Sequence, residues 1–85
     1  MKQPLVTIYS RTGCHLCENA ENLLAPLAQS LRFDLEVKLI DGNQELEDLY
    51  GQLIPVVQID GKHFTHFRVD LNEFKSSLEK HRQHQ

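Results

Sequence analysis

The sequence has no tryptophan, no long apolar run, and only two cysteines among its 85 residues. Its longest apolar stretches fall far short of the ~20 residues needed to span a bilayer, which argues against a transmembrane helix. The opening residues Met1-Lys2-Gln3-Pro4 lack the apolar segment of a signal peptide. We therefore expect a cytoplasmic protein without a membrane partner, in a compartment where structural disulfides are rare.

Blocks of like charge are also missing. The 9 basic residues are scattered, and 12 acidic residues bring the formal net charge to −3 at pH 7. This distribution makes nucleic acid an unsuitable partner. No linker, repeat or low-complexity tract interrupts the chain, and its length suits one modest core. We expect a single domain over residues 1–85 and a monomer.

The two cysteines, Cys14 and Cys17, stand just after the apolar run Leu5–Tyr9, where a helical pattern begins. A thiol at a helix N-terminus faces unpaired backbone N–H groups and the positive end of the helix dipole, which both favour the thiolate. A second thiol at i+3 lies on the same helix face and can form a disulfide with the first. In a reducing compartment such a pair is more often catalytic or metal-binding than structural. The spacing therefore predicts thiol–disulfide exchange.

Strand and helix patterns alternate along the rest of the chain. Apolar residues recur at helical spacing from Leu16 to Leu31, where we expect Leu23, Leu24, Leu27 and Leu31 to be core and Pro26 to kink the helix. Later elements are predicted at residues 35–40 (strand), 44–50 (helix), 56–59 (strand), 62–67 (strand after an Asp60-Gly61 turn) and from Asp70 onward (helix, with an Asp70/Glu73 capping box).

The resulting order is βαβαββα. A helix joins the first two strands, so they should be parallel, whereas the last two form an antiparallel hairpin. This predicts an α/β, thioredoxin-like domain with a four-stranded mixed sheet and helices on both faces.

Three segments resemble the glutaredoxins of the thioredoxin superfamily. Tyr9–Cys17 is similar to their active-site segment, and Ile54-Pro55-Val56 to the cis-proline loop. Tyr50-Gly51 and the short length resemble the small bacterial glutaredoxin-like proteins. The resemblance implies a thiol–disulfide oxidoreductase acting on protein or glutathione disulfides, with no bound cofactor.

We expect Cys14 to be the attacking thiol, since it lies nearest the helix start, and Cys17 to be the resolving thiol. Arg11 is a candidate substrate-binding residue, and Arg11 and His15 are candidate cations near the thiolate. The resemblance implies that Pro55 is cis and that Ile54 offers backbone groups to an extended substrate.

The chain also departs from the resemblance. Dithiol glutaredoxins usually carry Pro and an aromatic residue between the cysteines, where this sequence has His15 and Leu16. Their Gly-Gly pair, where the backbone approaches glutathione, corresponds here to His66-Phe67. Whether glutathione or a flavoprotein reductase supplies the electrons stays open.

Two other functions remain open: a metal or iron–sulfur module that uses the same cysteines, and a redox-sensing adaptor. His63 and His66 suggest zinc, but residues three apart on a hairpin are expected to point to opposite faces. We therefore predict no metal ligands. His81 and His84, beside Lys80 and Arg82, are expected in a solvated tail.

Overall fold

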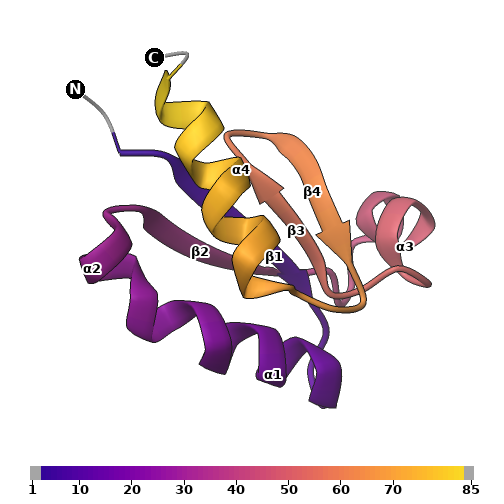
Figure 1. Cartoon of the computed structure of the whole chain (residues 1–85). Helices are drawn as coiled ribbons and strands as arrows, with labels where there is room; N and C mark the ends of the chain where they lie inside the picture. The colour runs from indigo at the N-terminus through magenta and orange to yellow at the C-terminus, as the bar shows by residue number, and fades with distance from the viewer. Residues whose placement is uncertain (1–2, 84–85) are drawn as a thin grey trace.

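The computed structural model describes residues 3–83, and its elements follow the predicted βαβαββα order (Figure 1). The elements are β1 (Leu5–Ser10), α1 (His15–Leu24), the 3₁₀ turn η1 (Ala25–Leu27), α2 (Ala28–Leu31), β2 (Asp34–Leu39), α3 (Gln44–Tyr50), β3 (Val56–Ile59), β4 (Lys62–His66) and α4 (Leu71–Gln83). The strands form one mixed sheet in the order β2-β1-β3-β4. As predicted, β1 and β2 are parallel, and β3 and β4 form an antiparallel hairpin.

Pro26 divides the first helical segment, as its missing N–H predicts. α1 ends at Leu24, and Pro26 lies in the 3₁₀ turn η1 before α2 resumes. The segment stops at Arg32, whose left-handed conformation (φ 58°) turns the chain back toward the sheet.

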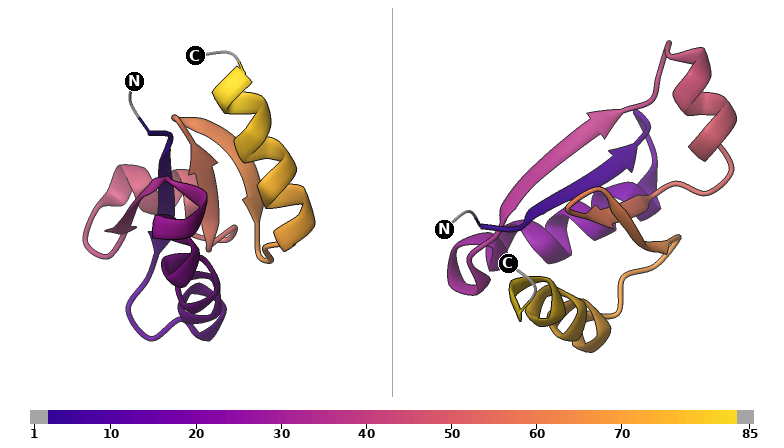
Figure 2. Two further views of the ribbon diagram at one scale, coloured as in Figure 1. Left: turned by 60° about the vertical axis from the view of Figure 1, so that its left-hand side comes forward. Right: turned by 90° about the horizontal axis from the view of Figure 1, so that it is seen from above.

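The core lies between the sheet and two helices. Val6 and Ile8 of β1 are fully buried against Leu24 of α1 and the α4 residues Phe74 and Leu78. Figure 2 shows α1 and α4 on this same side of the sheet. This layer provides most of the burial that stabilises so short a chain.

α3 packs on the opposite face of the sheet, at one end of the strands (Figure 2). Tyr50 of α3 stacks on Tyr9 of β1, with ring centroids 4.5 Å apart. The Tyr50 hydroxyl also accepts a hydrogen bond from Gln58 Nε2 of β3 at 3.2 Å. The prediction of helices on both faces is therefore confirmed.

A β-bulge changes the expected alternation of side chains in β4. Val57 pairs with Thr65, whereas the next residue, Gln58, pairs with His63, so β4 carries one extra residue there. As a result His63 and His66 point to the same face, and His66 Nδ1 lies 3.3 Å from His63 Nε2. The expectation that these histidines lie on opposite faces is wrong, because it assumed a regular strand.

The last helix begins where the capping box predicted and extends further than expected. The Glu73 N–H donates to Asp70 Oδ1 at 3.1 Å. His81 lies within α4 and its Nδ1 is 3.6 Å from Asp60 Oδ2, so it is not part of a solvated tail. His84 lies outside the described residues. Over residues 3–83, none of the helices has the length and apolar character needed to cross a membrane.

Candidate active site

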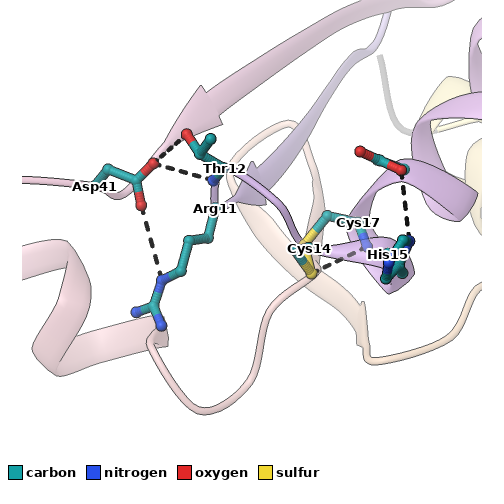
Figure 3. Close-up of a disulfide and its surroundings, with 7 residues drawn as sticks. Arg11, Thr12, Cys14, His15, Cys17 and Asp41 are labelled. Carbon is teal, nitrogen blue, oxygen red and sulfur yellow. Dashed lines mark hydrogen bonds and ion pairs between the residues drawn. A yellow bond between two sulfur atoms is a disulfide. The ribbon is translucent and has the colours of Figure 1, made fainter.

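Cys14 and Cys17 form a disulfide at the start of α1, with their Cα atoms 5.2 Å apart. Cys14 is the N-cap residue, and its sulfur accepts a hydrogen bond from the Cys17 N–H at 3.2 Å (Figure 3). Cys14 is half-buried, whereas Cys17 is fully buried. Cys14 is therefore the more exposed residue of the pair, and Cys17 is enclosed by the protein.

The loop that carries Cys14 is fixed to the strand beside it. Gly13 adopts a positive φ of 79°, which lets the chain turn sharply between β1 and α1. The preceding residue, Thr12, donates both its backbone N–H (3.0 Å) and its hydroxyl to Asp41, just after β2. These two hydrogen bonds, the hydroxyl bond foremost, and the charge of Arg11 lower the pKa of Asp41 below its usual 3.8, so its carboxylate is charged at neutral pH.

Arg11 is held by two carboxylates. Its Nη2 donates to Glu47 Oε1 of α3 at 2.6 Å, and its Nε lies 3.8 Å from Asp41 Oδ1. The predicted substrate-binding cation thus connects the Cys14 loop to α3. His15, the other candidate cation, has a side chain that is 94% exposed, with Glu18 Oε2 at 3.8 Å from its Nδ1.

The Ile54–Pro55 peptide bond is cis. Because Tyr9 pairs with Val56, this bond lies at the end of β1 that leads into the Cys14 loop. The Ile54 N–H already donates to the Tyr50 carbonyl at 3.1 Å. Two Ile54 backbone groups were predicted to meet a substrate, and the N–H is thus already engaged. Among the described backbone hydrogen bonds outside the regular helices and strands, none is accepted by the Ile54 carbonyl.

An apolar groove of about 360 Å³ lies between α1 and the β4–α4 loop. Its lining residues are Leu16, Asn19, Ala20, Leu23, Phe67, Arg68 and Val69. Leu16 directly precedes Cys17 in the sequence, so one residue of the CxxC motif also lines the groove. The prediction that Leu23 is core is wrong, since it is 38% exposed and lines this groove.

Phe67 forms one wall of the groove in an unusual conformation. Its φ is 66°, a region that non-glycine residues seldom occupy, and the residue is 45% exposed. Its N–H donates to the Pro55 carbonyl at 3.0 Å, which places it beside the cis-proline segment. Within the described part of the chain, no three His, Cys, Asp or Glu residues converge as a metal-binding group.

The sequence matches the family described as glutaredoxin-like domain (DUF836) over residues 5–79. The chain belongs to this family. An uncharacterised protein of Mycobacterium bovis is 30% identical, over 92% of this chain and 86% of that protein. The solution structure of protein Ne2328 from Nitrosomonas europaea is 33% identical with a TM-score of 0.78, covering 91% of this chain and 93% of that one.

The fold of this glutaredoxin-like chain also resembles thioredoxin itself. Thioredoxin from Fasciola hepatica superposes with a TM-score of 0.62 at 21% identity, over 94% of this chain and 83% of that one. The thioredoxin-like fold predicted from the sequence is thus confirmed, and the Cys14–Cys17 pair within it supports a redox function. Sequence reasoning missed the groove, because its walls come from two segments about 50 residues apart.

Proposed function

We propose that this glutaredoxin-like protein is a thiol–disulfide oxidoreductase that reduces protein disulfides. The Cys14 thiolate attacks one sulfur of the substrate disulfide, forms a mixed disulfide and releases the first substrate thiolate. The Cys17 thiolate then attacks Cys14 Sγ, forms the intramolecular disulfide and releases the second substrate thiolate. Two electrons pass to the substrate, and an external thiol or reductase must restore the reduced pair.

The observation that carries this proposal is the unequal placement of the two sulfurs. Cys14 is accessible and caps α1, where the Cys17 N–H and the helix dipole stabilise a negative sulfur. Cys17 is buried, so it is shielded from solution thiols yet already bonded to Cys14. This geometry suits attack by Cys14 and resolution by Cys17.

Substrate recognition is proposed to use the cis-proline segment. The Ile54 carbonyl accepts a hydrogen bond from an extended substrate chain, and Pro55 keeps that segment close to the Cys14 loop. Arg11 contributes by ordering the loop through Asp41 and Glu47, since both carboxylates already engage its guanidinium.

The choice of protein disulfides rests on the groove. Its apolar walls suit the side chain of a protein residue beside the disulfide, because burying apolar surface contributes about 25 cal/mol per Å².

Glutathione is small and polar, and in the resembled glutaredoxins it approaches a Gly-Gly backbone. Here Phe67 occupies that place. The ring of the adjacent His66 packs edge-on against the Phe67 ring, with ring centroids 4.8 Å apart. Glutathione is therefore the less suitable electron donor.

Replacing each cysteine by serine tests the mechanism. Reduction of insulin disulfides with dithiothreitol as donor should be lost in Cys14→Ser, because no attacking sulfur remains. Cys17→Ser should accumulate a mixed disulfide between Cys14 and the substrate, detected by mass spectrometry.

Asn22→Ala, an exposed change on α1, is the matched control and should keep wild-type turnover. Full activity in Cys14→Ser, or a substrate adduct on Cys17 in the wild-type protein, would show that the roles are assigned incorrectly.

A further inference from the structure

We propose that His63 and His66 form a two-nitrogen binding site for a divalent transition-metal ion such as Zn²⁺, separate from the redox pair. Both side chains are exposed on β4, and His66 Nδ1 lies 3.3 Å from His63 Nε2. The proposal goes beyond the oxidoreductase function and does not depend on it.

The separation of the two nitrogens fits metal coordination. Zinc binds histidine nitrogen at about 2.0–2.1 Å, so two ligands at the tetrahedral angle lie about 3.3–3.4 Å apart. Two ligands at a right angle would lie only about 2.9 Å apart at the same bond length. The observed 3.3 Å is therefore compatible with two adjacent tetrahedral positions around Zn²⁺ and too long for two positions at a right angle.

The fold places both histidines on one face of β4 before any ion binds. The bulge opposite Val57 and Gln58 brings the two histidines to one face of β4, and pairing with β3 fixes the backbone at both positions. The His66 ring also packs edge-on against Phe67, with centroids 4.8 Å apart. Ligands ordered in advance lose less conformational entropy on binding than free side chains do.

The donor set indicates the kind of ion and the kind of site. Neutral imidazole suits Zn²⁺, Cu²⁺ and Ni²⁺, and is a poor ligand for Mg²⁺ or Ca²⁺. Across residues 3–83, no third His, Cys, Asp or Glu completes the pair. The remaining positions are thus open to water or to an external ligand, as in zinc sites that exchange ligands.

A second arrangement explains the same distance without an ion: one ring donates a hydrogen bond to the other. The two arrangements differ in protonation, because metal binding requires both facing nitrogens to be unprotonated, whereas the hydrogen bond requires a proton on one of them. Only a metal site predicts that added Zn²⁺ shifts the ¹⁵N signals of both facing ring nitrogens.

The test uses untagged protein in its oxidised form, in which the Cys14–Cys17 disulfide has no thiolate for the metal. Zn²⁺ is titrated by calorimetry, and the histidine ring nitrogens are followed by ¹⁵N NMR. We expect one Zn²⁺ per chain, with shifts at His63 Nε2 and His66 Nδ1. His63→Gln and His66→Gln should each bind at least about tenfold more weakly, the change that 1.4 kcal/mol produces.

His15→Gln is the matched control, since His15 is an exposed histidine on α1 whose Nδ1 lies 3.8 Å from Glu18 Oε2. It should leave the affinity unchanged. Equal weakening in His15→Gln, unchanged affinity in the two β4 variants, or no shift of the named ring nitrogens would each overturn the proposal. Activity of the redox pair is not part of this test, so its outcome is independent of the proposed function.

Discussion

Replacing Phe67 by glycine should make the protein a better acceptor of electrons from glutathione without unfolding it. Phe67 has a φ of 66°, and its N–H bonds the Pro55 carbonyl beside the redox pair. Glycine keeps that backbone bond, accepts the positive φ, and removes both the ring and Cβ. The backbone there would become as open as the Gly-Gly pair of the resembled glutaredoxins.

The stability change can be worked out from three contributions. Relief of the left-handed conformation returns about 1–2 kcal/mol. Phe67 as a residue is 45% exposed, so loss of its ring removes roughly half of the 1.5–3 kcal/mol that full burial of a Phe provides. The greater freedom of glycine in the unfolded chain costs a further ~0.4–1 kcal/mol. The contributions nearly cancel, and the variant should remain within about 1 kcal/mol of wild type.

Phe67→Ala is the matched variant, because it removes the ring yet retains Cβ and the strained φ. In urea denaturation of the oxidised proteins, the Phe67→Gly variant should be at least as stable as Phe67→Ala. At most positions a protein with glycine is less stable than the same protein with alanine. In stopped-flow reduction by glutathione, the rate should rise from Phe to Ala to Gly. If the glycine variant is clearly less stable than alanine, or if glutathione reduces all three at one rate, the reasoning about residue 67 is wrong.

Two further predictions concern stability. Phe74→Ala should lower the free energy of unfolding in urea by about 3–5 kcal/mol, since the ring is fully buried between α4 and the sheet; a loss below 1 kcal/mol would contradict that placement. Asp41→Asn should make stability less dependent on acid: the lowered pKa of Asp41 means that its contribution is present above pH 3.8 and lost as pH falls through the folded pKa. Urea denaturation from pH 7 to pH 2 should show wild type and Asp41→Asn converging at the acid end, and a constant difference would refute the linkage.

The sequence predicted elements well where local signals were sufficient. α3 at Gln44–Tyr50 and β3 at Val56–Ile59 have the predicted bounds, because Asn43 caps the helix and a proline precedes the strand. The CxxC pair was equally predictable, since its chemistry depends on two residues of one helical turn.

The features that sequence missed depend on contacts between distant segments. The β4 bulge arises from pairing with β3, and no residue of β4 indicates the extra position. Helical spacing placed Leu23 and Leu24 together in the core, yet neighbours on a helix point about 100° apart, and only Leu24 meets the sheet. The groove likewise needed the β4–α4 loop to reach α1.

Leu16 belongs to the redox motif and to the groove wall at once. A substitution at Leu16 therefore changes both the motif that holds the cysteines and the wall of the groove. Under the proposed function, we expect a substitution there to affect the redox pair and substrate selection together, so neither can be adjusted at this position alone. Val69, which lines the same groove from the far side, offers a way to alter selectivity while the motif between the cysteines stays intact.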